Sequence, residues 1–190
     1  MVQNIGFESE TLTKPSSLYG NSLFILPGVG SFDEGMTRLK KFGWDIFLKE
    51  SALDSTNSIL GLCLGMQLLC DQSEEGKLEG LGLIPGHFRH FRSFAWTSFT
   101  KKVPHMGWNQ VEFVKSNSKI YEGLGTDSRY YFVHSYAYSH SSNEFVDGMT
   151  NYGIAFPSII RKGKILGLQF HPEKSHKYGK ELLGRVISKF

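Results

Sequence analysis

Apolar residues occur along the chain in two kinds of series, short continuous runs and longer runs with helical spacing. Residues 23–26 form a continuous run, which predicts a buried strand leading into the loop at 27–30. Helical spacing follows, so we expect an amphipathic helix with Ser31 or Asp33 as its N-cap. The apolar members of that helix are Met36, Leu39, Phe42, Ile46 and Phe47.

The second half of the chain has a different pattern. Between about residues 81 and 171 short apolar stretches predict several strands, including a hairpin around 162–163 that joins 159–160 to 165–166. A closing helix is expected because Leu182, Leu183, Val186, Ile187 and Phe190 share one face, and we interpret them as core. With no internal repeat, residues 1–190 are predicted to form a single α/β domain.

Composition removes several classes of function. The formal net charge of +3 comes from scattered Lys and Arg, whereas a nucleic-acid-binding domain would show a basic stripe with interleaved aromatics. No apolar run approaches the ~20 residues of a membrane helix, and the N-terminus lacks the apolar stretch of a signal peptide. Two cysteines provide no disulfide framework. We therefore expect a soluble cytoplasmic protein.

The strongest chemical signal is Cys63. It follows an apolar run and has Gly61 and Gly65 two positions to either side, the pattern of a nucleophile raised on a sharp strand-to-helix turn. A thiol at a helix N-terminus is favoured as thiolate. The alternative for any free cysteine is a small buried hydrophobe, and that is our interpretation of Cys70, which has no glycine frame.

A second chemical element lies near the C-terminus. Residues 164–170 predict a strand that runs into His171, Pro172 and Glu173. Positions i and i+2 of an extended chain point to the same side, so Glu173 can hydrogen-bond one ring nitrogen of His171 and leave the other for a thiol. A zinc site from His171 and His176 is excluded, because Pro172 breaks any helix between them.

Six segments of the chain together resemble a known family. They are PGVG at 27–30, GLCLGMQ at 61–67, EGLGLIPG at 79–86, KVPHMGWN at 102–109, YFVHSY at 131–136 and HPEKS at 171–175. The chain resembles class I (triad) glutamine amidotransferases, and within them the glutaminase subunits of imidazole glycerol phosphate synthase. The resemblance implies a flavodoxin-like fold: a mostly parallel sheet flanked by helices, with extra antiparallel strands.

The resemblance also implies a reaction. Cys63 would attack the side-chain carboxamide of glutamine, His171 would transfer the protons, and Glu173 would orient His171. The thioester would then be hydrolysed to glutamate, with no metal or organic cofactor.

Further roles come from the same family. The loop at 27–30 could also begin a dinucleotide-binding fingerprint, but Asp33 stands where a third glycine is needed. In the family this loop supplies an oxyanion-hole N–H, here from Val29, beside that of Leu64. The residues implied for the amino-acid end of glutamine are Gln67, Glu75, Ser135 and Tyr136. Glu74 is the alternative to Glu75.

The resemblance implies a partner as well. Ammonia would pass to a (β/α)8-barrel cyclase subunit, which makes imidazole glycerol phosphate and an aminoimidazole carboxamide ribotide, and Lys174 matches a family lysine at that interface. Relatives begin with a strand and a helix, and this chain lacks the counterpart of that strand and of most of that helix. We therefore expect a domain that is N-terminally truncated relative to the family, with an exposed sheet edge.

Two other functions stay open at the level of sequence. A paralogous subunit could feed ammonia to a nucleotide-sugar amidotransferase in surface polysaccharide synthesis, with the same catalytic residues and a different partner surface. A catalytically impaired interaction protein is the alternative of another class. A cysteine peptidase on this fold fits less well, because Gln67 and the segments at 102–109 and 131–136 match amidotransferases.

Overall fold

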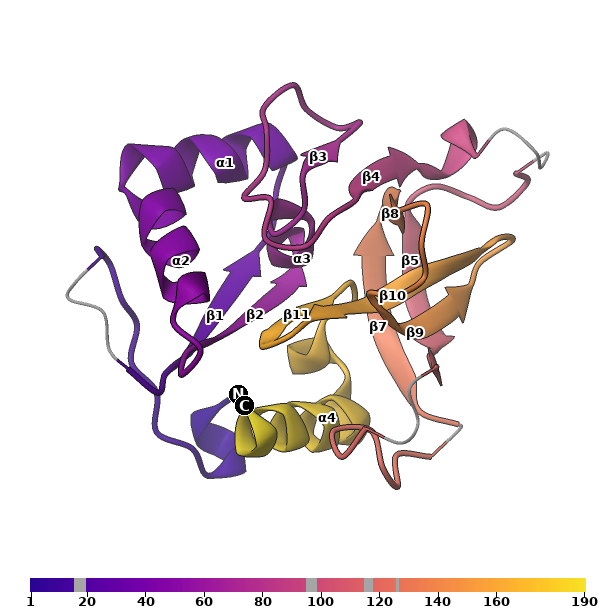
Figure 1. Ribbon diagram of the computed structural model, residues 1–190. Coiled ribbons are helices and arrows are strands. Elements are labelled where there is room, and N and C mark those ends of the chain that lie inside the picture. The colour runs from indigo at the N-terminus through magenta and orange to yellow at the C-terminus, as the bar shows by residue number, and fades with distance from the viewer. Residues whose placement is uncertain (16–19, 95–98, 115–117, 126) are drawn as a thin grey trace.

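The computed structural model spans residues 1–190 and describes all of them except 16–19, 95–98, 115–117 and 126. At its centre is a six-stranded sheet with the order β1-β2-β11-β10-β9-β6 (Figure 1). The strands are β1 (Leu23–Gly28), β2 (Ser58–Cys63), β11 (Ile165–Leu168), β10 (Ala155–Lys162), β9 (Val146–Asn151) and β6 (Glu112–Phe113). β1, β2 and β11 run parallel, and β10, β9 and β6 continue the sheet with antiparallel pairings.

Helices cover both faces of this sheet, which confirms the α/β fold class. Those on one side are α1 (Phe32–Lys41), α2 (Trp44–Leu53) and the short α3 (Leu64–Leu68). On the other side is α4 (His176–Lys189), with the N-terminal segment and its 3-10 turn η1 (Gln3–Ile5) against it. The two chain ends lie close together in Figure 1.

The core has two halves because successive side chains of a strand point to opposite faces. Ile59 of β2 packs with the residues of α1, α2 and α3, whereas its neighbour Leu60 packs with Leu182 and Val186 of α4. The side chain of Ile59 is 1% exposed, and that of Leu60 is fully buried. Burial on both faces is the usual condition of parallel strands.

Two smaller sheets flank the central one, as the pattern of short strands predicts for 81–171. One contains β3 (Gln72–Ser73), β4 (His87–His90) and β8 (Tyr136–Ser139), and the other contains β5 (His105–Gln110) and β7 (Arg129–His134). The 3-10 turn η2 (Phe91–Ser93) follows β4, and the 3-10 turn η3 (Pro172–Lys174) precedes α4. The predicted hairpin is confirmed, because Lys162 pairs with Ile165 across its turn.

The predicted amphipathic helix is in fact two helices. Gly43 has a φ of 74°, a left-handed conformation that ends α1 and starts α2 in a new direction. As a result Phe42 and Ile46 lie on the surface, 55% and 60% exposed. Ser31 takes the predicted N-cap position, but its side chain makes no capping hydrogen bond.

β1 is the first strand in the order of the central sheet, so its outer edge is paired with no strand of the described residues. Its residues are mostly half-buried, whereas those of β2 beside it are almost all buried. An exposed edge was expected from the resemblance. The single domain and its truncation relative to the family stay predictions.

Candidate active site

The topology brings Cys63 and His171 to the same edge of the sheet. Cys63 is the last residue of β2, and the parallel pairing of β2 with β11 ends at Leu62 and Leu168. His171 follows three residues later, where its backbone N–H donates to the Tyr131 carbonyl at 2.9 Å. Carboxyl ends of neighbouring parallel strands are where α/β proteins place their sites.

The turn at Cys63 has the strained geometry that its glycine frame predicts. Cys63 has φ 52° and ψ −108°, a conformation that L residues rarely adopt. A Cβ on Gly65 would lie 1.9 Å from the Leu26 carbonyl oxygen, and one on Gly61 would lie 2.7 Å from the backbone of Gly65. Only glycine fits either position. The helix that follows, α3, has five residues.

His171 and Glu173 meet as predicted, although by a different local geometry. The His171 Nδ1 atom lies 2.7 Å from Glu173 Oε1. His171 itself is extended, but Pro172, Glu173 and Lys174 form η3, with Pro172 at its first position. A 3-10 turn, and not the i/i+2 alternation of a strand, therefore brings the carboxylate back to the ring.

The protonated ring of His171 and the ionised carboxylate of Glu173 stabilise each other. Burial alone would lower the pKa of His171, but the neighbouring Cys63 and the hydrogen bond with Glu173 outweigh it and raise the pKa to about 9. Burial acts against ionisation of Glu173 too, and the hydrogen bond from His171 nevertheless lowers its pKa. The other ring nitrogen of His171, Nε2, is buried and has no hydrogen-bond partner among the described residues, so it can act on Cys63 or a substrate.

A cavity of about 430 Å³ opens over Cys63. Its volume is in the range of small-molecule sites. Of the residues predicted for the site, Cys63, His171, Val29, Leu64, Gln67, Glu75, Ser135 and Tyr136 line it. Glu173 is outside the lining, behind the ring of His171. The structure thus gathers segments that are far apart in the sequence around one thiol.

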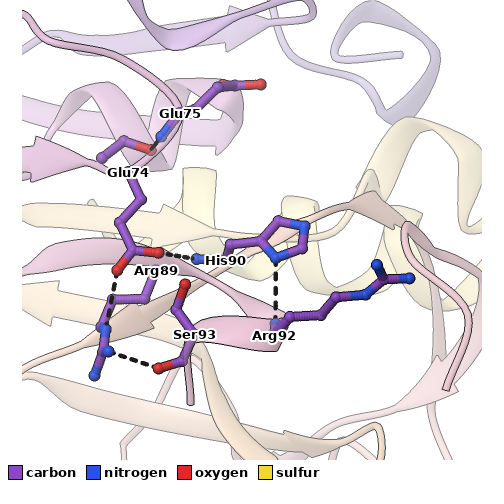
Figure 2. Close-up of polar contacts among 7 residues, drawn as sticks. Glu74, Glu75, Arg89, His90, Arg92 and Ser93 are labelled. Carbon is purple, nitrogen blue, oxygen red and sulfur yellow. Dashed lines mark hydrogen bonds and ion pairs between the residues drawn. The ribbon is translucent and has the colours of Figure 1, made fainter. Parts of the chain in front are cut away.

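The structure distinguishes the two adjacent carboxylates, which point to different sides in Figure 2. Glu74 faces away from the cavity, where it accepts hydrogen bonds from Arg89 Nε at 3.2 Å and from the backbone N–H of His90 at 2.8 Å. Glu75 lines the cavity and accepts the backbone N–H of Phe32 at 2.9 Å. Glu75 therefore also satisfies a free N–H at the start of α1, which a capping side chain would otherwise bind.

Comparison with protein-family models matches residues 2–188 to glutamine amidotransferase class-I. The chain belongs to this family. Among curated proteins it is 42% identical over 187 residues to imidazole glycerol phosphate synthase subunit HisH 2 of Methanococcus maripaludis, covering 98% of this chain and 90% of that protein. It is 39% identical to subunit HisH of Carboxydothermus hydrogenoformans, covering 96% and 87%.

Solved structures agree on the fold of the amidotransferase. A crystal structure described as a glutamine amidotransferase has a TM-score of 0.69 at 21% identity, covering 96% of this chain and 90% of that one. A glutamine amidotransferase from Thermotoga maritima has a TM-score of 0.62 at 18% identity, with 95% and 81% covered. Both support the flavodoxin-like class predicted from the sequence.

Two glutamine side chains lie near the thiol of Cys63, and one of them, Gln67, lines the amidotransferase cavity. Gln67 is 4% exposed, and its Nε2 atom donates to Gln169 Oε1 at 3.5 Å. Gln169 in turn directs its Nε2 atom at Cys63 Sγ, at 4.0 Å. The Oε1 atom of Gln67 is buried and has no hydrogen-bond partner in the part of the chain that the structure describes, which leaves it as an acceptor for a bound molecule.

Sequence reasoning missed Gln169 and the cavity-lining residues Gly30, Pro104, Val133 and His134. A signal existed for Gln169, since it lies two positions before His171. His134 was inside a recognised segment but received no role, because its significance depends on the strand that pairs with it. Pro104 and Val133 reach the cavity only through the pairing of β5 with β7, which the sequence did not predict.

Within the described part of the chain, no group of three His, Cys, Asp or Glu side chains is arranged to hold a metal ion. No helix in that same part is long and apolar enough to cross a membrane. Cys70 is fully buried, and burial raises the pKa of its thiol well above the ordinary value, as expected of a core residue.

Proposed function

We propose that this amidotransferase is the glutaminase subunit of an imidazole glycerol phosphate synthase, acting in histidine biosynthesis. The observation that carries the proposal is the placement of a strained thiol and a carboxylate-paired histidine at the ends of adjacent parallel strands. The relatives in Methanococcus maripaludis and Carboxydothermus hydrogenoformans, both named as subunits of that synthase, supply the choice of pathway.

In the proposed reaction the thiol of Cys63 loses its proton to His171 and attacks the carboxamide carbon of glutamine. Charge develops on the carboxamide oxygen, which the N–H groups of Val29 and Leu64 are expected to bind. Collapse of the tetrahedral intermediate breaks the C–N bond, and protonated His171 gives its proton to the departing ammonia. A water activated by the same ring then hydrolyses the thioester and releases glutamate, while Glu173 stabilises each cationic form of the ring.

The cavity also supports recognition of the amino-acid end of glutamine. A substrate ammonium group needs acceptors, and Glu75 and the unpaired Oε1 atom of Gln67 both lie in the lining. The backbone of Ser135 and Tyr136 borders the same space. We assign these four residues to substrate binding.

Ammonia is then expected to pass to the cyclase subunit, a (β/α)8 barrel. We place that partner over the aromatic surface beside Lys174. This surface consists of Trp108, Tyr131, Lys174 and His176. The Lys174 ammonium lies 5.8 Å from the Tyr131 ring centre, and Trp108 stacks on His176 at 5.4 Å. Trp108 is 45% exposed, and neighbouring Met106 is 61% exposed. Exposed aromatic and Met side chains are typical of interfaces.

The test is a glutamate-release assay with and without the cyclase subunit. We expect the cyclase to increase turnover, and Cys63→Ser to lower it by at least about 10⁴-fold, as loss of a nucleophile does in other triads. Formation of imidazole glycerol phosphate by the complex identifies the pathway. Equal turnover with and without the cyclase would exclude a synthase subunit, and activity only with a sugar amidotransferase would favour the paralogous function.

The cellular location belongs to the same proposal. Both cysteines are buried and unpaired, which fits the reducing cytoplasm. We therefore infer that the enzyme acts in the cytoplasm.

A further inference from the structure

Two histidines lie side by side between the cavity and the surface. His105 of β5 and His134 of β7 are opposite each other in the strand register, and they are 2% and 5% exposed. The Nδ1 atom of His105 is 3.0 Å from the Nε2 atom of His134. One of these nitrogens must carry a hydrogen and the other must not, and their neighbours determine which.

The outer end of the pair is set by Asn109. The Oδ1 atom of Asn109 accepts the backbone N–H of Gln110 at 2.8 Å, and its Nδ2 atom donates to the Asn151 carbonyl at 2.9 Å. These two contacts fix the orientation of the amide. The same Nδ2 atom lies 3.2 Å from His105 Nε2, so it must donate there as well. His105 therefore accepts at Nε2 and carries its hydrogen on Nδ1.

The contacts of His134, at the cavity end of the pair, independently give the same direction of hydrogen bonding. The Nδ1 atom of His134 is 2.7 Å from the Tyr136 carbonyl oxygen, which can only accept, so Nδ1 carries the hydrogen. The Nε2 atom of His134 is then free to accept from His105. All the hydrogen bonds run in one direction, from Asn109 through His105 and His134 to Tyr136.

Both imidazole rings must be neutral for this series of hydrogen bonds to form. A second hydrogen on His105 would point at the Asn109 N–H, and one on His134 would point at the N–H of His105. Burial lowers the pKa of His105 to about 4 and the pKa of His134 to about 3, so neither ring takes up a proton near neutrality.

The series of hydrogen bonds ends on a turn of the backbone that borders the cavity. Residues 133–136 all line the space over Cys63. The Tyr136 carbonyl is held by His134, and the Ser135 carbonyl accepts the backbone N–H of Phe91 at 3.1 Å. With both carbonyls held, the turn has one backbone orientation toward the cavity.

We propose that Asn109, His105 and His134 are positioning residues whose directed hydrogen bonds fix the backbone of Ser135 and Tyr136 for the amino-acid end of glutamine. This inference rests on the proposed function of the cavity. Contacts to the amino-acid end hold substrate and transition state alike, so their loss raises KM and leaves kcat nearly unchanged.

The test compares two substitutions of equal shape in the complex with the cyclase subunit. His105→Asn can place an amide N–H where the ring Nδ1 stood and still donate to His134, whereas His105→Leu cannot. Both lose the same ring volume, so a difference in KM between them reports the lost donor and not the lost volume. We expect His105→Leu to raise the KM for glutamine about tenfold, the effect of about 1.4 kcal/mol, with His105→Asn close to wild type and kcat unchanged in both.

Nitrogen-15 NMR of the histidine rings supplies a second measurement. We expect His105 and His134 to be neutral Nδ1–H tautomers in the wild-type protein. If His105→Leu does not fold, Asn109→Ala replaces it, because Asn109 is only half-buried. We expect this variant to show a mixture of tautomers at His105 and a raised KM for glutamine.

Two results overturn the positioning role alone: a hydrogen on Nε2 of either ring, or equal KM values for the Leu and Asn variants of an active complex. A wild-type complex that leaves glutamine intact would instead overturn the proposed function and the positioning role with it. The ring tautomers would still be measured in that case, which separates the two failures.

Discussion

Cys63 and His171 are both buried, and the proposed chemistry depends on the neighbours of the histidine. His171 is 3% exposed, and without Glu173 and Cys63 burial would leave it neutral. With them its pKa rises to about 9, so the imidazolium form is present at neutral pH.

The titration of His171 is the first prediction. Its folded pKa of about 9 lies above the ordinary 6.5, so the protonated ring stabilises the fold in full below pH 6.5. That contribution is lost as the pH rises through about 9. NMR should find the ring of His171 titrating near 9, and Glu173→Gln should lower this value by about one to three pH units.

Glu181→Gln is the matched control for that substitution. Glu181 is also a surface carboxylate with one ion-pair partner, Arg185, but it lies on α4. Its replacement should leave the His171 titration unchanged. A His171 ring that titrates near 6.5 in the wild type would contradict the assigned ion pair.

At single positions the sequence predicted the local geometry well where the signal came from a few neighbouring residues. The glycines around Cys63 and the pairing of His171 with Glu173 need only a few neighbouring residues. The second contact of Glu75, to the N–H of Phe32, joins positions 43 residues apart, and no local pattern contains it. The same holds for the orientation of Glu74 toward Arg89.

Among the elements, the turn from β2 into α3 tolerates little change. A Cβ on Gly65 would overlap the Leu26 carbonyl of β1, so the turn, the helix and the neighbouring strand would all have to move. We predict that Gly65→Ala costs at least about 3 kcal/mol of unfolding free energy and abolishes glutaminase activity. Thermal and urea unfolding followed by circular dichroism measure the first effect.

Gly184→Ala serves as the comparison on α4. A Cβ there would meet its nearest atom only at 4.0 Å, so alanine should stabilise the helix by about 0.5–1 kcal/mol. A Gly65→Ala protein as stable as Gly184→Ala would show that the close approach at β1 is not needed.

The strand pair β5 and β7 makes the protein sensitive to acid. His105 and His134 are neutral in the fold down to pH values near 4 and 3, but take up protons in the unfolded chain below 6.5. The unfolded state then binds more protons, so stability falls as the pH drops from 6.5 toward 4, by about 1.4 kcal/mol per pH unit for each histidine. Urea unfolding across this range measures the slope.

His105→Asn removes one of the two titrating rings and should reduce that slope by about 1.4 kcal/mol per pH unit. An unchanged slope in this variant would mean that His105 is protonated in the fold.

Prediction of elements from the sequence succeeded where apolar spacing was regular and failed where a single backbone angle decided the outcome. The strand at 23–26, the hairpin at 162–163 and the closing helix were predicted. The break at Gly43 was not, because apolar spacing continues across it while the φ of 74° redirects the chain. η3 was likewise mistaken for the end of a strand.

For the whole molecule, the aromatic surface beside Lys174 leads to a prediction about assembly. If the cyclase docks there, Lys174→Ala should weaken binding about tenfold, as loss of an interface residue worth more than 1 kcal/mol does. The isolated subunit should unfold at the same temperature as wild type because Lys174 is exposed. Isothermal titration calorimetry with the cyclase subunit measures the affinity.

Lys177→Ala is the control for this experiment. Lys177 is another exposed lysine whose ammonium lies over an aromatic ring, that of Tyr178 at 4.8 Å. It lies outside the aromatic surface, so its loss should leave cyclase binding unchanged. Equal affinities for both variants would move the partner away from Lys174.

The arrangement of the whole molecule was only partly accessible from the sequence. Resemblance supplied the central sheet, but the pairing of β5 with β7 and of β4 with β8 depends on contacts between distant segments. These small sheets carry the turn at 133–136 to the cavity. The outer wall of the site therefore required a structure.

The parallel pairing of β2 with β11 has a consequence for the synthesis of the protein. Cys63 and Gln169, which face each other in the finished site, are 106 residues apart in the chain. At a translation rate of about 5–20 residues per second, the nucleophile is made about 5–20 s before the strand that leads to its base. Until β11 inserts beside β2, a nascent chain has a thiol without a histidine. We expect activity to begin only after the last strand and helix have left the ribosome, so that unfinished chains release no ammonia.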